Sequence, residues 1–265
     1  MYCFDEETRA TKSAGGQWHG VVSPEWNIGD NPNGGYLLSL ISSALSQEIA
    51  HPDPISITTH YLRPGLQDTE YQINIDVIRV GRTLSNVRAT LIQAGKPRLE
   101  VMAVYGDLSQ SVGVENEIPM IAPVIPAEPL CCDRTGDLQG IELPIMNRLS
   151  VRLNPEQSVS GESTEPVISG WIRFTDGREP DARSLLLFCD AFPPSPFGYL
   201  GNVGWVPTVE LTVHVRQRPA VGWILGQFTT NHLAGGRMIE SGALWDSTGS
   251  LVAQSRQLGL ILDKP

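Results

Sequence analysis

The chain has 265 residues, of which 41% are hydrophobic and 18% are charged, so it can bury a sizeable core and is not an intrinsically disordered protein. Its formal net charge of −10, with no cluster of Lys or Arg, argues against a nucleic-acid partner. Residues 1–7 contain neither a basic leader nor an apolar segment, and no window approaches the roughly eighteen apolar residues of a membrane span, so we expect a cytoplasmic protein without membrane insertion.

In the first half, the chain is predicted to form one apolar helix followed by a set of strands. Residues 17–27 suit one or two short strands, and the turn sequence at 31–35 also suits the start of a helix. Apolar side chains at helical spacing predict a helix over 36–49, and because most of its surface is apolar it needs a sheet around it. The strands are predicted at 55–62, 70–80, 83–94 and 98–107, with a turn at Gly95.

The second half repeats this order after a stretch rich in proline and acidic residues. Strands are predicted first, at 147–153 and 166–175. An apolar helix is predicted over 182–190, with Asp181 as its N-cap and Pro193-Pro194-Ser195-Pro196 as the sequence that ends it. Four further strands complete this half, at 207–215, 221–232, 236–246 and 250–262.

Matching landmarks indicate that the two halves are copies of one unit. His60 and His214 lie 154 residues apart, and Pro64 and Pro219 lie 155 apart. We therefore predict an α+β fold of two tandem copies, each an antiparallel sheet wrapped around one long apolar helix. The first copy is expected at 1–112, a linker at 113–143 and the second copy at 144–265. We expect the two sheets to pair edge to edge, because such pairing hides two open edges.

Three segments resemble the type II acyl-CoA thioesterases and their double-hotdog relatives. They are His60-Tyr61-Leu62-Arg63-Pro64-Gly65, Gly170-Trp171-Ile172-Arg173 with Asp190 downstream, and Val252-Ala253-Gln254-Ser255-Arg256-Gln257. The similarity covers nearly the whole chain except 108–143. It implies a tandem double hotdog that hydrolyses acyl-CoA, its substrate, to free fatty acid and CoA without a cofactor.

The resemblance also implies the catalytic residues. In that family an Asp, a Thr and a Gln together hold the water that attacks the thioester. The matching motifs place these roles on Asp190 at the end of the second helix, Thr208 at the start of the next strand and Gln257 on the last strand. The chain departs from the family just after the Thr, where Glu210-Leu211 stands in place of a frequent Asp-His pair.

These residue types suit thioester hydrolysis on chemical grounds as well. A carboxylate in an apolar pocket is a better base than one in water, because desolvation raises its pKa. The hydroxyl of Thr208 and the amide of Gln257 can fix the same water without titrating. Gly34 and Gly35 open the first helix, where unpaired N–H groups can polarise the acyl carbonyl, so we expect them to bind substrate.

Structural alternatives stand beside these assignments. Asp190 at a helix end can face solvent, and Thr208 and Gln257 can be outward strand residues. His60 and His214 better fit sheet positions with satisfied hydrogen bonds than a catalytic site. Arg82 and Arg237 mark the repeat. Each can form a structural ion pair or contact a CoA phosphate.

Composition also bears on metals and on rival functions. The four cysteines form no CxxC motif and the five histidines have no paired metal spacing, so we expect reduced thiols and no metal site. Ser42, and no acid, stands near the position that corresponds to Asp190, which predicts a single catalytic half. The main alternative is a non-catalytic acyl- or lipid-binding hotdog protein, and a hotdog dehydratase is disfavoured because its His-plus-acid pair is not evident. A homo-oligomer is possible.

Overall fold

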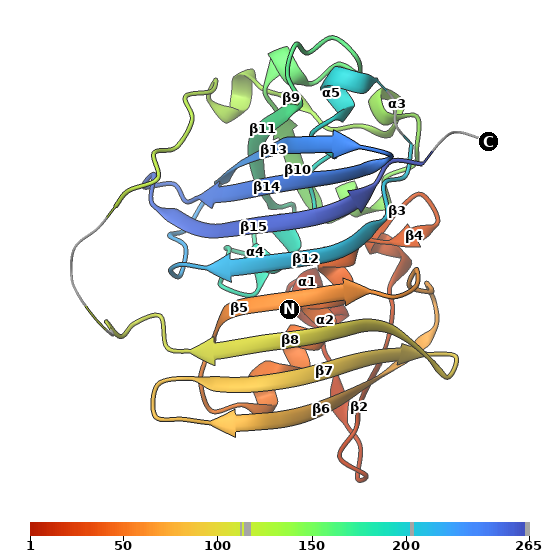
Figure 1. Cartoon of the computed structure of the whole chain (residues 1–265), viewed down its shortest axis with the longest axis vertical. Helices are drawn as coiled ribbons and strands as arrows, with labels where there is room; N and C mark the ends of the chain where they lie inside the picture. Colours follow the sequence, from red (N-terminus) through yellow and green to blue (C-terminus); the bar gives the residue numbers. More distant parts are fainter. Residues whose placement is uncertain (112, 114–117, 202–203, 263–265) are drawn as a thin grey trace.

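The computed structural model describes residues 1–111, 113, 118–201 and 204–262, and it has the α+β architecture predicted above (Figure 1). Thirteen described strands form one antiparallel sheet, and a second, two-stranded sheet lies beside it. The predicted domain boundary at residue 112 and the linker residues 114–117 lie outside the described residues. None of the helices in the described part of the chain is both long and apolar enough to cross a membrane.

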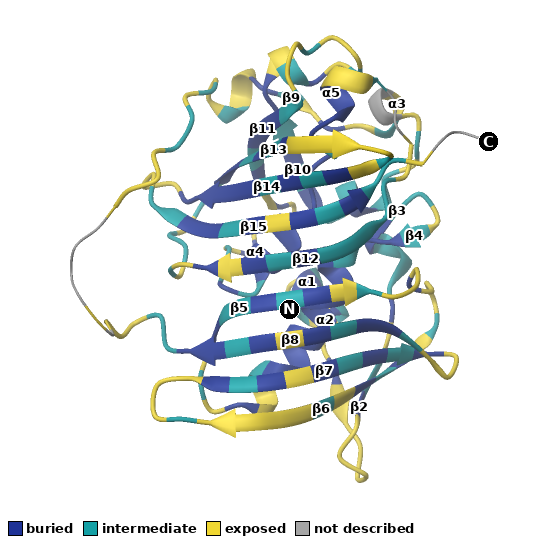
Figure 2. Ribbon diagram, viewed as in Figure 1, coloured by how far each residue is buried: buried dark blue, intermediate teal, exposed yellow. Residues whose placement is uncertain are grey.

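The first half supplies six strands of the large sheet. Its elements are α1 Cys3–Glu7, β1 Thr11–Lys12, β2 Trp18–Val21, the 3-10 helix η1 Pro24–Trp26, β3 Asn27–Ile28, β4 Asn31–Pro32, α2 Gly34–Glu48, β5 Asp53–Tyr61, β6 Glu70–Val80, β7 Ser85–Gln93 and β8 Lys96–Gly106. Buried and exposed residues alternate along strands such as β7, so one face of the sheet packs on α2 (Figure 2).

The second half supplies the other seven strands. Its elements are η2 Glu128–Leu130, β9 Cys132–Asp133, α3 Gly136–Gln139, η3 Pro144–Asn147, β10 Leu149–Leu153, η4 Pro155–Gln157, β11 Val167–Phe174, α4 Ser184–Phe188, α5 Phe197–Leu200, β12 Thr208–Val215, β13 Ile224–Ala234, β14 Arg237–Trp245 and β15 Leu251–Leu260. The strand order across both halves is β1-β2-β6-β7-β8-β5-β12-β15-β14-β13-β11-β10-β9. The predicted strands and helices correspond to these elements, and their ends differ by at most three residues.

The two halves differ in their helices. α2 has 15 residues and begins where the Asn33 side chain accepts a hydrogen bond from the N–H of Tyr36. α4 has only five residues, so the prediction of one long apolar helix in each half is not confirmed for the second half. The Asp181 carboxylate accepts from the N–H of Ser184, the first residue of α4, and the chain leaves the helix before Pro193, which cannot continue it.

The edges of the two halves join at the centre of the sheet, as predicted. β5 and β12 pair in an antiparallel register that runs from Glu210 opposite His60 to His214 opposite Ser56 (Figure 1). Thr58 and Thr212 face each other at the middle, with 3.0 Å between their hydroxyl oxygens. The repeat is therefore visible as an approximate two-fold relation about this pair.

Part of the predicted linker packs on the second half. The indole N–H of Trp171 donates to the carbonyl of Pro126, and that of Trp245 donates to the carbonyl of Met120. Further along, β9 pairs with β10 at the end of the large sheet. The linker bounds of 113–143 stay a prediction, but its later residues contribute a strand to the second half.

The amino-terminal helix α1 fastens the two halves together. The ring of Phe4 is buried between Trp26 of the first half, at 5.8 Å, and Phe174 of the second, at 5.1 Å between ring centroids. Glu7 accepts from Arg148 of the second half at 2.7 Å and from the indole N–H of Trp26 at 2.9 Å. The contacts of α1 thus bridge elements that are far apart along the chain.

We expect Phe4→Ala to lower the free energy of unfolding by about 3–5 kcal/mol, because the buried ring leaves a cavity between both halves. Urea unfolding followed by tryptophan fluorescence measures the change. Tyr2→Ala is the control, since this neighbouring ring is 47% exposed and its loss should cost far less. Equal losses for the two variants would contradict this role of α1.

Candidate functional site

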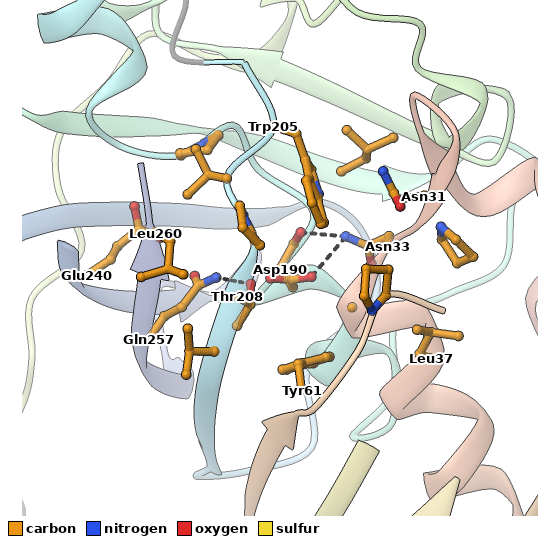
Figure 3. A pocket seen from close by; sticks show the side chains of 18 of the residues that line it. Asn31, Asn33, Leu37, Tyr61, Asp190, Trp205, Thr208, Glu240, Gln257 and Leu260 are labelled. Atoms are coloured by element: carbon orange, nitrogen blue, oxygen red, sulfur yellow. Dashed lines mark hydrogen bonds between the residues drawn. The ribbon is translucent and has the colours of Figure 1, made fainter. Parts of the chain in front are cut away.

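A cavity of about 260 Å³ lies where the two halves meet. The start of α2 and the end of β5 bound it on one side, and the end of α4 with the inner face of β12, β14 and β15 bounds it on the other (Figure 3). Its polar lining consists of Asn31, Asn33, Tyr61, Arg63, Arg134, Asp190, Thr208, Glu240 and Gln257. Its apolar lining includes Leu37, Phe192, Phe197, Trp205, Phe228, Met238 and Leu260.

The carboxylate of Asp190 is held by the helix start of the opposite half. Its Oδ2 accepts from the backbone N–H of Gly35 at 2.9 Å and from the side-chain amide of Asn33 at 3.0 Å. The same Asn33 amide donates to the main-chain oxygen of Asp190 at 2.8 Å. Asp190 is half-buried and lines the cavity, so the alternative of a solvent-facing helix end is wrong.

Burial raises the pKa of Asp190 to about 6. The N–H of Gly35, the amide of Asn33 and the N–H of Gly34 lower this pKa, as does the positive charge of Arg134. Because these groups only partly offset the loss of hydration, the Asp190 carboxylate is a stronger base than an exposed carboxylate.

Gly34 and Gly35 permit the close approach of the two halves. A Cβ at Gly34 would lie 2.9 Å from Asp190 Oδ2, and one at Gly35 would lie 2.9 Å from the main-chain oxygen of Leu187. The sequence predicted that N–H groups here polarise the substrate carbonyl. The N–H of Gly35 donates to Asp190 and Gly34 lines the cavity, and the substrate-binding role of both glycines stays a prediction.

Thr208 and Gln257 meet across neighbouring strands. Gln257 is 8% exposed, points to the inner face of the sheet and donates through Nε2 to the hydroxyl oxygen of Thr208. Both side chains line the cavity that Asp190 lines, so the alternative of outward strand positions is wrong for Gln257 (Figure 3). The three residues chosen from the sequence are thus gathered at one site, although their roles as water ligands stay a prediction.

Register shows what stands at the corresponding places of the first half. Gln257 lies opposite Leu211, as Ala103 lies opposite Ile57 in the first half, so Ala103 is the counterpart of Gln257. By the same register, Pro54 is the counterpart of Thr208, and a strand irregularity follows each of them. The hydroxyl of Ser42 lies 3.1 Å from the hydroxyl of Tyr105, and its correspondence to Asp190 stays a prediction from the sequence. The Asp190 carboxylate, the Thr208 hydroxyl and the Gln257 amide thus have no equivalents at these first-half positions of the described structure.

Sequence reasoning missed two buried titratable side chains at the cavity. Arg134 is 4% exposed and donates to the main-chain oxygen of Ala191 at 2.6 Å, and burial lowers its pKa to about 9. It was assigned to the linker, where no periodic pattern predicts burial. Glu240 is 5% exposed. Its signal was an acid at an inward position of an alternating strand, between Met238 and Gly242.

A third missed residue is Tyr61 at the end of β5. Its hydroxyl is buried and has no hydrogen-bond partner among the described residues, and its side chain lines the cavity. Burial, followed by the negative charges of Asp190 and Glu210, raises its pKa, so it is a neutral donor at physiological pH.

In the described part of the chain, no group of three His, Cys, Asp or Glu side chains could hold a metal ion.

Two family models match this chain in tandem. The model described as the acyl-CoA thioesterase N-terminal domain matches residues 22–106, and the model described as the acyl-CoA thioesterase C-terminal domain matches residues 129–261. Asp190, Thr208 and Gln257 fall within the second match, and Gly34 and Gly35 fall within the first. The cavity therefore lies between the two matched domains.

Three similar proteins match nearly the whole length of this chain. A crystal structure from Thermobifida fusca, of a presumed thioesterase II, has a TM-score of 0.88 and 28% identity, and the similarity covers 99% of this chain and 98% of that one. An acyl-CoA thioesterase II from Mycobacterium marinum, at 16% identity, shares the fold with a TM-score of 0.77 over 99% of each chain. An uncharacterised protein from Mycobacterium tuberculosis is 25% identical over 92% of this chain and 90% of its own length.

We expect Asn33→Ser to raise the pKa of Asp190 above about 6, because the serine hydroxyl can still cap α2 but no longer brings an amide donor to the carboxylate. Carboxyl-carbon NMR over a pH titration, with Asp190→Asn to assign the signal, measures the pKa. Asn31→Ser is the matched control, since it changes a cavity residue that none of the described hydrogen bonds joins to Asp190. An unchanged pKa in Asn33→Ser would contradict the role of this amide.

Proposed function

Since this chain belongs to the acyl-CoA thioesterase family, we propose that it hydrolyses acyl-CoA to free fatty acid and CoA by direct attack of a water molecule that Asp190 activates. The observation that carries the proposal is the raised pKa of a carboxylate that the opposite half holds in an apolar-walled cavity. Acyl-CoA is the proposed partner. Cytoplasmic location, a role in fatty acid metabolism and a homo-oligomeric state stay predictions from the sequence.

The proposed reaction begins with a proton transfer. Asp190 accepts a proton from the water as the water oxygen attacks the thioester carbonyl carbon. The tetrahedral intermediate then expels the CoA sulfur, and the proton on Asp190 passes to this leaving group. The hydroxyl of Thr208 and the amide of Gln257, joined by a hydrogen bond, orient the water without titrating.

The helix start has two roles in this proposal. The N–H of Gly35 and the amide of Asn33 keep the Asp190 carboxylate in one orientation while leaving its pKa near 6. Gly34 lines the cavity, so the positive end of the α2 dipole lies beside the substrate and can stabilise negative charge on its carbonyl oxygen. The hydroxyl of Tyr61 is a second donor beside Asp190.

The acyl chain is proposed to occupy the apolar side of the cavity. Phe192 and Phe228 pack there with 4.9 Å between their ring centroids, and Leu37 and Phe197 add further apolar surface. An apolar wall with a few convergent polar groups is typical of sites for small ligands. The same wall suits the alternative function, a non-catalytic acyl- or lipid-binding protein, and release of free thiol from acyl-CoAs distinguishes the two.

We expect Asp190→Asn to lower the hydrolysis rate by about 10²–10⁴-fold, because the amide keeps the shape of the side chain but cannot accept the proton. Thiol release from a panel of acyl-CoAs measures the rate, and circular dichroism confirms folding. Ser42→Ala is the control in the first half and should stay within a few-fold of the unchanged protein. Full hydrolysis by folded Asp190→Asn would favour another catalytic pair. If the unchanged protein binds acyl-CoA but releases no thiol, the binding function stands.

Thr208→Val and Gln257→Leu should each lower kcat more than they raise KM, because these side chains orient the water and not the acyl chain. Steady-state kinetics with one acyl-CoA gives both constants. Phe197→Leu, which alters the apolar wall, is expected to act mainly on KM. A change in KM alone for the Thr208 and Gln257 variants would place them in substrate binding instead.

A further inference from the structure

A row of buried polar side chains crosses the inner face of the second half. Thr230 on β13 lies opposite Glu240 on β14, and Glu240 lies opposite Gln257 on β15. Their exposed fractions are 7%, 5% and 8%. In the first half the same register places Val77 opposite Val87, and Val87 opposite Ala103. The polar row is therefore present in the half that carries Asp190 and replaced by apolar residues in the other.

One oxygen of Glu240 is already engaged. Its Oε2 accepts from the backbone N–H of Ser195 at 2.7 Å, and the Ser195 hydroxyl lies 2.7 Å from that of Thr230. These contacts come from the side of the carboxyl group that faces β13 and the chain before α5. Glu240 also lines the cavity, so its carboxyl group can make a further hydrogen bond on that side.

Gln257 offers a partner for this hydrogen bond. Its Nε2 donates to Thr208, which lies on β12, and β15 runs between β12 and β14. The oxygen and nitrogen of an amide diverge from its carbon, so with Nε2 on Thr208 the Oε1 atom is free to meet a group on the other side of β15, where Glu240 of β14 is the directly paired residue. Paired residues on one face have Cβ atoms about 4.5–5.5 Å apart, within reach for two such side chains.

We propose that Glu240 is a positioning residue for Gln257: as a neutral carboxyl group it donates a hydrogen bond to Gln257 Oε1 and so keeps Nε2 turned toward Thr208. An amide oxygen only accepts, so this contact requires a proton on Glu240. Thr208 then accepts from Gln257, and its own hydroxyl proton stays available to the reacting water. The inference rests on the proposed function only for this last step.

Electrostatics supports a neutral Glu240. Burial, together with the negative charge of Asp190, raises its pKa to about 7 even though Ser195 donates to it. Loss of the proton above this pH would turn the Gln257 amide over, so that Nε2 donates to Glu240 and Oε1 accepts the hydroxyl proton of Thr208. The water would then lose a donor, and the rate should fall as the pH rises through about 7.

Four other groups that line the cavity have a pKa shifted from its ordinary value. They are Tyr61, Arg134, Cys189 and Asp190. Asp190 titrates near 6, burial lowers the pKa of Arg134 to about 9, burial raises the pKa of Cys189 to about 12, and burial raises that of Tyr61 well above its ordinary value. The groups packed against Glu240 from β13, β15 and the chain before α5 are Thr230, Gln257 and Ser195, which do not titrate.

Glu240→Gln tests the proposal, because its amide can accept from Ser195 and donate to Gln257 at every pH. In the unchanged protein kcat should fall by about tenfold per pH unit above neutral, as for loss of one proton. In Glu240→Gln this fall should disappear, with a rate at pH 6.5 within a few-fold of the unchanged protein. Glu100→Gln removes a carboxylate from β8 of the first half and should keep the fall. A fall that persists in Glu240→Gln would overturn the proposal, and a purely structural role would not move the pH profile.

A second measurement is independent of turnover. The side-chain amide nitrogen signal of Gln257, identified by its loss in Gln257→Leu, should titrate with a midpoint near 7 in the unchanged protein and stay constant in Glu240→Gln. If this signal titrates but the protein releases no thiol from acyl-CoA, the proposed hydrolysis is wrong and the inference about Glu240 still holds. A Gln257 signal that does not respond between pH 6 and 8 would overturn the inference whatever the activity.

Discussion

The carboxylate of Asp190 accepts hydrogen bonds from Gly35 and Asn33, and this contact fixes how the two halves meet. The donors belong to the start of α2 in the first half, whereas the acceptor ends α4 in the second. Neither half contains both partners, so each half alone would leave the carboxylate or the helix start without its match. The pairing of β5 with β12 and the contacts of α1 hold the halves in the geometry that this bond needs.

The two halves share their strand arrangement but differ in the residues that line the cavity. The central Thr58–Thr212 contact and the matching strand irregularities keep the approximate two-fold relation. Around the cavity that relation breaks down, because Ala103 stands where the second half has Gln257 and Val87 where it has Glu240. A sheet can accept such exchanges one face at a time, since side chains alternate between its two faces.

The cavity holds two buried carboxyl groups whose surroundings differ. Asp190 receives backbone and amide donors and has the charge of Arg134 nearby, which together limit the rise of its pKa to about 6. Glu240 receives hydrogen bonds only from Ser195 among the described groups, and the charge of Asp190 raises its pKa further, to about 7. The charged form of Asp190 therefore has more stabilising neighbours than that of Glu240, which suits a base and a neutral donor in one site.

Local patterns in the sequence determined the strands, the long helix α2 and the repeat, because periodicity and turn residues act over short distances, whereas Asp190, Thr208 and Gln257 were implied by the resemblance to the thioesterase family. The same patterns overestimated the length of α4, which ends at Phe188, ahead of the prolines that begin at Pro193. Only the tertiary structure decided which partners the site residues have. Gly35 donates to a carboxylate 155 residues away, and Arg134, which lies in the predicted linker, lines the cavity. The pKa of a carboxyl group depends on burial and on such distant neighbours, so it follows from the packing of the chain and not from any local pattern.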